Sequence, residues 1–220
     1  KKFRAKQVHE WLWKKRAIDF SQMTNLSKSL RNLLEENFII NGILLKEAQK
    51  SKDKTIKNAF LLSDQSVIEG VLIPTKKRMT ACVSVQVGCS LDCAFCATGK
   101  LKRVRNLNAD EIYDQVVMIN EQSINEYEIP ISNIVYMGMG EPLLNYNSVI
   151  KSIDKITSPD GLGMSPKRIT VSTAGISKMI LKLADDKVKF NLALSLHAAN
   201  DEKRNKIMPI NESNTLDTLM

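Results

Sequence analysis

The four cysteines of this 220-residue chain all lie between positions 82 and 96, and three of them, Cys89, Cys93 and Cys96, have the spacing CxxxCxxC. Thiolates are the usual ligands of iron–sulfur clusters. Three thiolates on a four-iron cluster leave one iron without a protein ligand, and a catalytic metal needs an open position to hold a substrate. The spacing therefore predicts a catalytic cluster, because electron-transfer clusters held by four cysteines lack this vacancy.

Zinc and a disulfide are the alternative uses of these cysteines. Structural zinc would need a fourth ligand, for which His9, His197 and Cys82 are the candidates, and such sites tend to use paired CxxC knuckles. Disulfides belong to secreted chains, whereas the first residues here lack the apolar core of a signal peptide. Metal ligation is favoured over a disulfide, and zinc stays open as the alternative metal.

Strands and helices are expected to alternate around the cysteines. A strand is predicted over 80–87, and Gly88 lets the backbone turn sharply after it. Strands are then predicted over 132–137, 168–173 and 189–196, and helices over 109–122, 146–156, 176–185 and after Asn200, with Asn108, Asn145 and Asn200 as N-caps. Apolar strands alternating with helices imply parallel pairing buried on both faces. The α/β pattern has four strand–helix units, enough for an open sheet or two thirds of a partial barrel.

The amino-terminal quarter holds the whole charge excess of the chain. Residues 1–60 contain 14 Lys and Arg against 6 Asp and Glu, whereas residues 61–220 contain 18 of each kind. Short helices are predicted over 4–16 and 23–37, and strands over 42–50, 57–63 and 67–74. We expect a basic helical domain over 1–50, a β-hairpin extension over 51–79 and an α/β domain over 80–220. The basic domain indicates nucleic acid as partner, with a solvated basic face as the alternative.

Apolar runs in this chain are short. None approaches the ~18 residues of a membrane span. Together with the missing signal peptide, this predicts a cytoplasmic protein without membrane attachment.

The cysteine loop, with Phe95 before its last cysteine, resembles the signature of the radical S-adenosylmethionine (SAM) superfamily. The resemblance implies a partial (β/α) barrel and a [4Fe-4S] cluster on Cys89, Cys93 and Cys96. It also implies that the amino and carboxylate groups of SAM chelate the open iron, and that one electron cleaves SAM to methionine and a 5′-deoxyadenosyl radical.

Further positions match SAM contacts of this superfamily. Met137–Pro142 resembles its GGEP motif, in which Gly140 permits close approach of the ligand and Glu141 accepts a hydrogen bond from the SAM ammonium group. The other matches are Phe95 in the cysteine loop, Ser172 after the next strand, and Ser195, Leu196 and His197 after the strand that follows. The positions after strands lie at carboxyl ends, where barrel active sites form. A simple turn and a core histidine are the alternatives that this context outweighs.

Longer segments resemble the RlmN family, whose members methylate C2 of an adenine in 23S rRNA and in tRNA. These segments are Phe3–Val8, Cys82–Cys89, Met137–Pro142, Ala193–Ala198 and Met208–Asn211. The sister Cfr family methylates C8 and typically has alanine in place of Pro142 and cysteine in place of Val87, so RlmN is favoured. The resemblance implies 23S rRNA, tRNA and an electron donor such as flavodoxin or ferredoxin as partners. A non-catalytic RNA-binding module with a structural metal site is the alternative from another class.

The family mechanism implies two further catalytic residues. One SAM methylates a cysteine near the carboxyl terminus, and the radical from a second SAM activates that methyl group for addition to the adenine. Glu69 matches the proposed proton acceptor, and its apolar sequence neighbours are expected to disfavour its ionised form. Cys82 matches the cysteine that resolves the protein–RNA adduct through a transient disulfide. The alternatives are a solvent-facing glutamate and a small core residue.

The methyl-carrying cysteine of the family is expected beyond Met220. The chain is therefore expected to be a fragment that holds the cluster and cleaves SAM but does not methylate RNA by itself.

Overall fold

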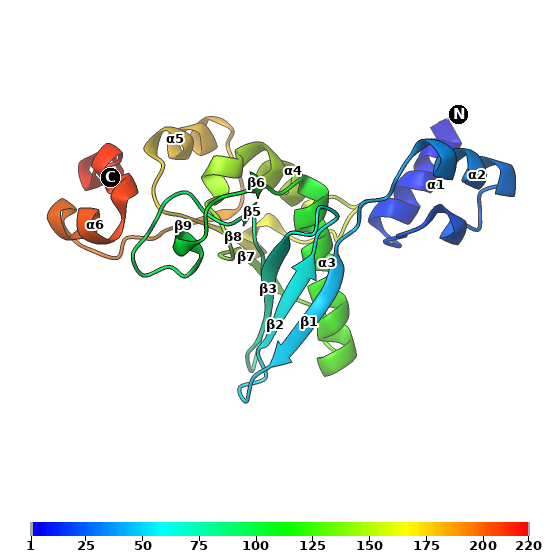
Figure 1. The fold of residues 1–220 in the computed structure, drawn as a ribbon, viewed down its shortest axis with the longest axis horizontal. Coiled ribbons are helices and arrows are strands. Elements are labelled where there is room, and N and C mark those ends of the chain that lie inside the picture. Colours follow the sequence, from blue (N-terminus) through cyan, green and yellow to red (C-terminus); the bar gives the residue numbers. More distant parts are fainter. Residues whose placement is uncertain (1, 220) are drawn as a thin grey trace.

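The computed structural model describes residues 2–219 and is built around a seven-stranded mixed sheet (Figure 1). In sheet order its strands are β1 (Leu44–Lys50), β2 (Ile56–Leu61), β3 (Val67–Pro74), β4 (Met79–Cys82), β7 (Asn133–Tyr136), β8 (Ile169–Thr173) and β9 (Asn191–Leu194). Strands β1 to β4 pair antiparallel, whereas β4, β7, β8 and β9 pair parallel. The predicted α/β class and the parallel pairing of its strands are confirmed.

Helices α3 (Ala109–Tyr127) and α4 (Tyr146–Thr157) cover one face of this sheet. The other α-helices are α1 (Lys2–Trp13), α2 (Lys28–Asn37), α5 (Ser177–Asp185), α6 (Asp201–Ile207) and α7 (Leu216–Leu219). The covered face buries alternate side chains, including Ile68, Leu72, Ile134 and Val171, in one core with residues of α3 and α4. Each such side chain contributes roughly 1.5–3 kcal/mol by leaving water, so this core holds the sheet in place.

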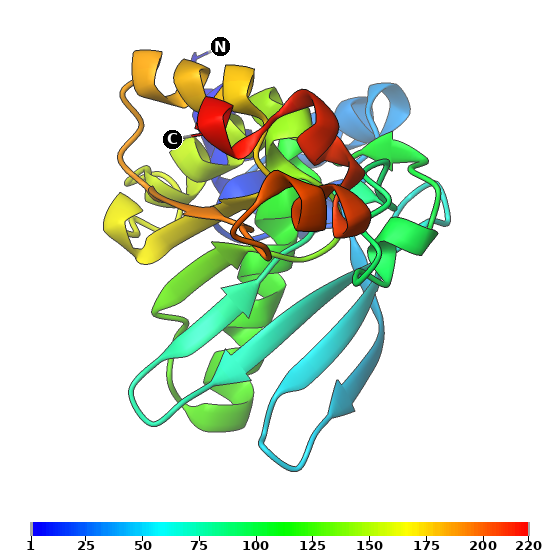
Figure 2. The ribbon, with the colours of Figure 1, turned by 90° about the vertical axis from the view of Figure 1, so that its left-hand side faces the viewer.

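The opposite face of the sheet is open over its antiparallel half. Every residue of β1 is exposed, and along β3 the odd-numbered positions from Val67 to Ile73 are exposed or half-buried. The register pairs Val71 with Cys82 and Cys82 with Val135, so these three residues share that face. Figure 2 shows the hairpins of β1 to β3 extending away from the carboxyl-terminal helices α6 and α7.

The predicted strand over 80–87 is divided in two. β4 ends at Cys82, and β5 (Gln86–Val87) pairs with β6 (Arg105–Asn106) in a separate ribbon. Between them the chain still follows β7, because Val83 N–H donates to the Val135 carbonyl at 3.0 Å and Val85 N–H to the Met139 carbonyl at 2.8 Å. The division redirects the chain into the cysteine loop.

The amino-terminal helical part is shorter than predicted. Residue Ser27 caps α2 by accepting a hydrogen bond from Leu30 N–H, so this helix begins at 28 rather than 23. Met23 and Leu26 instead lie in the preceding loop, where they form a small core with Ala17 and Phe20. The expected boundaries at 50 and 79 also differ from the structure, because 44–50 and the hairpin 56–74 are strands of the main sheet.

Two of the three predicted N-caps fulfil that role. Asn200 accepts a hydrogen bond from Lys203 N–H, and the first turn of α3 forms a capping box between Asn108 and Glu111. Asn145 precedes α4, but its side chain donates to the carbonyls of Val85 and Leu107 instead. No helix within residues 2–219 is long and apolar enough to cross a membrane.

Candidate active site

A cavity of about 320 Å³ lies where the cysteine loop meets the carboxyl ends of β7, β8 and β9. Its walls include most of the side chains proposed from the sequence. These are Cys89, Cys93, Phe95, Cys96, Gly140, Glu141, Ser172 and Ser195. The fold therefore brings residues from four separate segments of the chain to one place.

The cysteine loop leaves and re-enters the fold through a narrow neck. β5 and β6 pair across it, and Cys89 N–H donates to the Leu101 carbonyl at 3.2 Å. Gly88 has φ +73°, and a Cβ built there would lie 2.2 Å from the Lys102 carbonyl oxygen. Only glycine satisfies both the left-handed backbone and the close approach of the returning chain.

The three thiols of the loop are free and line the same cavity. Burial raises the pKa of Cys93 to about 11, and the negative charges of Cys89 and Cys96 act in the same direction. Burial likewise raises the pKa of Cys89. Thiols this close repel one another as thiolates, so a bound cationic centre is what would stabilise all three in the ionised form.

The donor set fits an iron–sulfur cluster with one open iron. Within residues 2–219 no three His, Cys, Asp or Glu side chains converge on one ion position. A four-iron cluster instead takes each thiolate on a different iron, so its ligands need not converge on a point. Three residues were considered as a fourth zinc ligand. His9 lies on α1 and contacts Lys155, and neither Cys82 nor His197 lines the cavity.

Glu141 is a buried carboxylate in the wall opposite the cysteine loop. Its Oε1 accepts a hydrogen bond from Leu143 N–H at 3.0 Å, and its Oε2 accepts one from Ala174 N–H at 2.7 Å. Burial raises the pKa of this carboxyl, and hydrogen bonds from Ala174 N–H, the Thr173 side chain and Leu143 N–H lower it. A carboxylate has about four lone-pair sites, so with three donors bound it is able to accept one further bond from an ammonium group.

Gly140 gives the loop before Glu141 its shape. It has φ +96°, and a Cβ there would lie 2.5 Å from Cβ of Gln86. The fully buried Gln86 accepts a hydrogen bond from Glu141 N–H through Oε1 at 2.9 Å. Gln86 was not among the predicted site residues, although it lies within the Cys82–Cys89 segment.

The remaining positions matched to SAM contacts lie at the ends of β8 and β9. The hydroxyl oxygens of Ser172 and Ser195 are 3.3 Å apart. His197 has a left-handed backbone, φ +57°, and its ring lies 4.1 Å from that of Phe95 between centroids. Leu196 is exposed beside it and, like His197, lies outside the cavity wall.

The two residues matched to later catalytic steps do not line this cavity. Cys82 is buried in β4, where desolvation raises the pKa of its thiol to about 11, against a hydrogen bond with the Met137 backbone. Glu69 is on the open face of β3, its side chain is 49% exposed, and its carboxylate lies 2.6 Å from Lys57 Nζ. The expected apolar surroundings of Glu69 are therefore wrong, because strand alternation turns its apolar neighbours Ile68 and Gly70 to the other face.

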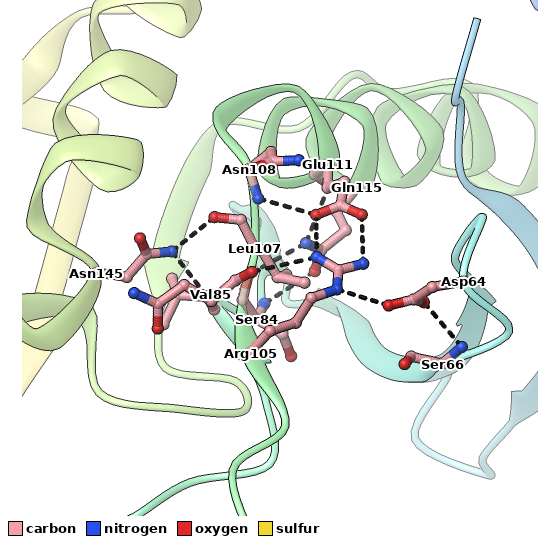
Figure 3. Close-up of polar contacts among 11 residues, drawn as sticks. Asp64, Ser66, Ser84, Val85, Arg105, Leu107, Asn108, Glu111, Gln115 and Asn145 are labelled. Atoms are coloured by element: carbon pink, nitrogen blue, oxygen red, sulfur yellow. Dashed lines mark hydrogen bonds and ion pairs between the residues drawn. The ribbon is translucent and has the colours of Figure 1, made fainter. Parts of the chain in front are cut away.

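A network of polar side chains holds the neck of the cysteine loop from outside (Figure 3). Arg105 on β6 donates to both oxygens of Glu111 at 2.8 Å and to Asp64 at 2.6 Å. Glu111 also accepts from Asn108 N–H at 2.8 Å. Arg105 thus joins the neck to the β2–β3 turn and to the start of α3, an arrangement that charge spacing in the sequence did not indicate.

Comparisons with known proteins agree with this geometry. A family profile described as "Radical SAM superfamily" matches residues 83–219, and one described as "Ribosomal RNA large subunit methyltransferase N-terminal domain" matches residues 1–40. The chain is 62% identical over 219 residues to a "Probable dual-specificity RNA methyltransferase RlmN" of Christiangramia forsetii, covering 100% of this chain and 62% of that protein. It is 46% identical over 220 residues to a protein of the same name from Pseudothermotoga lettingae, covering 100% and 63%.

The fold also matches a solved structure, described as a radical SAM methyltransferase from Sphaerobacter thermophilus. The TM-score is 0.90 at 37% identity, and the match covers 99% of this chain and 64% of that one. The chain therefore spans slightly less than two thirds of the length of these relatives.

Proposed function

This chain belongs to the RlmN family of the radical SAM superfamily, and on that premise we propose that its protein methylates C2 of an adenine in 23S rRNA and in tRNA. The relatives carry the name of a dual-specificity RNA methyltransferase. The substrates, the methyl-cysteine intermediate and a flavodoxin or ferredoxin as electron donor are parts of the proposal. With these RNAs as substrates, the protein acts in the cytoplasm.

The observation that carries the proposal is the shared cavity of the three thiols and Glu141. A [4Fe-4S] cluster and SAM are the cofactors of this superfamily, and the bound cluster supplies the electron that cleaves SAM. Cys89, Cys93 and Cys96 would hold it. Glu141 would orient the ammonium group of SAM.

Other groups of the cavity suit the rest of the SAM molecule. The paired hydroxyls of Ser172 and Ser195 present donors and acceptors at the strand ends. The rings of Phe95 and His197, tilted by 39° to each other, form an aromatic edge beside the cysteine loop. A small number of polar groups in a mostly apolar wall is the usual composition of a site for a nucleoside-sized ligand.

The proposed RNA steps would use the open face of the sheet. Cys82 and Glu69 lie on neighbouring strands and point to this face, since Cys82 pairs with Val71 and Glu69 is two residues from Val71. The Cys82 thiol also contacts the backbone of Met137, which lines the cavity. Resolution by Cys82 and proton removal by Glu69 would therefore occur on the same side of the sheet, and Glu69 would first have to leave Lys57.

Mass spectrometry of nucleosides tests the proposal. The whole protein is expressed in cells that lack their own RlmN, and nucleosides from 23S rRNA and from tRNA are separated. We expect 2-methyladenosine in both RNAs, and none when Cys89 is replaced by alanine. 8-Methyladenosine would instead indicate Cfr-type chemistry, and RNA binding with unmodified RNA would indicate the non-catalytic module.

A further inference from the structure

The segment Met208–Asn211 resembles the RlmN family but has no role in the proposal so far, and its first residue, Met208, lines the cavity. Met208 is buried and packs with Leu91 and Ala174 in a small cluster that also touches Cys89 and Cys93. In the turn before this segment, the Ile207 carbonyl accepts a hydrogen bond from Ala94 N–H at 2.9 Å. The end of α6 is thus fastened directly to the cysteine loop.

Arg204 on α6 ties this wall to the strand ends. Its side chain is fully buried, at 0% exposure. Nε donates to the Leu196 carbonyl at 3.1 Å, and Nη2 donates to the carbonyls of Ala174 at 2.5 Å and Ser195 at 3.2 Å. Nη1 donates to the side-chain oxygen of Asn211. One guanidinium therefore fixes the ends of β8 and β9 and the segment that covers the cysteine loop.

The positive charge of Arg204 is poorly compensated. Its acceptors are neutral oxygens, and no carboxylate lies within ion-pair distance of it in the described part of the chain. The side chain of Asn211 stands between it and Asp201, to which Asn211 donates at 2.7 Å. Arginine stays protonated even when buried, so the charge persists.

Arg204 lies close to the cysteine loop. Ala174, whose carbonyl accepts a hydrogen bond from Arg204 Nη2, packs in the small apolar cluster that also touches Cys89 and Cys93. An uncompensated cation in a low-dielectric interior favours any negative charge placed near it. Net charge and burial around a cluster are among the factors that set its reduction potential.

We propose that Arg204 is a positioning residue with two effects: its hydrogen bonds fix the strand ends that contact SAM, and its buried charge raises the reduction potential of the cluster. The inference rests on the proposed cluster and SAM site. It assigns Met208–Asn211 the role of holding Arg204 in place through Asn211.

Reductive titration followed by electron paramagnetic resonance, and calorimetric binding of SAM, test the proposal without RNA. Arg204→Gln removes the charge and the fork, so we expect a more negative midpoint potential and SAM affinity lowered tenfold or more. Arg204→Lys keeps the charge, so the potential should stay near that of the wild type while SAM affinity falls. Arg168→Gln is the control, because this exposed side chain donates only to the Ser132 carbonyl at 3.3 Å.

Asp201→Asn provides a variant with an effect of opposite sign. The Asp201 oxygen that accepts from Asn211 and from Leu216 N–H is retained as an amide oxygen, while the negative charge near Arg204 is lost. We expect a less negative potential with unchanged SAM affinity, and this variant decides the charge effect if Arg204→Gln does not load a cluster.

The effect of the Arg204 charge on the reduction potential and the effect of its hydrogen bonds on SAM binding can be overturned separately. A wild-type potential in Asp201→Asn overturns the charge effect, and wild-type SAM affinity in Arg204→Lys and Arg204→Gln overturns the positioning effect. Failure of the wild-type protein to hold a cluster would instead contradict the proposed function.

Discussion

Glu141 is a buried carboxyl that already accepts hydrogen bonds from two backbone donors, Leu143 N–H and Ala174 N–H. A glutamine at this position keeps only one oxygen, which can accept from one of the two backbone N–H groups. Its amide group would then point its own hydrogens at the second N–H. We expect Glu141→Gln to weaken SAM binding at least tenfold, because a hydrogen bond to a charged group contributes about 1.5–3 kcal/mol. Calorimetry measures this, with the exposed Glu126→Gln as matched control. A wild-type dissociation constant would remove Glu141 from the SAM site.

The cysteines divide into three that line the cavity and Cys82, which is buried in β4. Cys89→Ala should lose bound iron and SAM cleavage, since it removes one of three thiolates. Full iron content in this variant would contradict the cluster.

Cys82→Ala should keep both bound iron and SAM cleavage. In the whole protein with RNA it should accumulate a covalent protein–RNA species visible on a denaturing gel. Normal turnover of this variant without an adduct would make Cys82 a core residue.

At the residue scale, the spacing of the three loop cysteines agrees with their common cavity, because residues close together in one loop stay close wherever that loop folds. Their role as cluster ligands stays a prediction. The surroundings of Glu69 were predicted wrongly, since alternation along β3 turns its sequence neighbours to the other face. Gln86 and Arg204 escaped prediction for a different reason. Their partners lie far away in the sequence, and a lone polar residue does not indicate whether it will be buried.

Among the elements, the ribbon β5–β6 closes the cysteine loop and depends on Glu111, which is 5% exposed. Glu111→Gln leaves the guanidinium of Arg105 without its paired carboxylate. We expect a loss of about 2 kcal/mol in unfolding free energy, below the usual cost of breaking a buried pair because Arg105 keeps Asp64. Denaturant unfolding measures it, and the release of iron to a chelator should accelerate. Asp64→Asn should have a milder effect, since Asp64 accepts only one bond from Arg105. A wild-type unfolding free energy and a wild-type rate of iron release in Glu111→Gln would be incompatible with this anchoring.

Helix α3 also carries Asp114, which faces the amino-terminal helical part across an apolar cavity. Burial raises the pKa of Asp114 to about 6 from 3.8, against attraction from Arg16. In the folded state this carboxyl holds its proton more tightly than in the unfolded chain, so its contribution to stability falls as pH rises from about 4 to 6 and is lowest above 6.

Asp114→Asn should therefore raise unfolding free energy at pH 7 by about 2 kcal/mol and flatten the decline between pH 4 and 6, because the amide oxygen still accepts from Ile43 N–H. Denaturant midpoints measured across this range give the slope. The exposed Asp185→Asn on α5 is the control, and an Asp114→Asn variant with the wild-type slope would show that Asp114 ionises freely.

Element boundaries were predicted less well than element types. The strand over 80–87 was expected to be continuous because valines recur along it and it contains no glycine or proline, but its hydrogen bonds change partner after Cys82. Helix α3 runs five residues beyond its predicted end and stops where Glu128 adopts the left-handed conformation. The residue types alone do not indicate the break in the strand after Cys82 or the end of this helix.

For the whole molecule, the parallel half of the sheet followed from strand–helix alternation, which allows few other arrangements. The antiparallel extension did not, because nothing in the sequence of β1 to β3 says that they continue the same sheet rather than form a separate hairpin. The open face that results carries Glu69 and Lys57 on strands that were expected to form a β-hairpin extension before the α/β domain.

The charge excess of residues 1–60 has a different distribution in the structure from that in the sequence. Lys14, Lys15 and Arg16 form the densest basic run, but each lies within 3.8 Å of a carboxylate, and Arg16 pairs with Glu121 on α3 at 3.0 Å. Neutralising this run would disturb the contact between the helical part and the sheet. Lysines that are exposed and outside any ion pair among residues 2–219 are better probes of RNA binding.

Lys2, Lys6 and Lys28 meet this condition on the helices α1 and α2. If the helical part binds phosphates, changing all three to glutamine should weaken RNA binding about equally for unrelated sequences. It should also lower the slope of log affinity against log salt by up to about 1 per lost contact, because fewer counterions are released. SAM cleavage without RNA should not change, since the cavity lies in the other part of the fold.

The matched control is a second triple variant with the same loss of charge, at the exposed Lys167, Lys178 and Lys189 near β8 and α5. Binding is measured from low to moderate salt for both variants and the wild type. A steeper loss for the helical variant assigns the RNA surface to residues 1–60. Equal slopes for all three proteins would mean that the basic charge of the helices is only solvated, and a loss confined to the second variant would place the RNA surface beside the parallel strands.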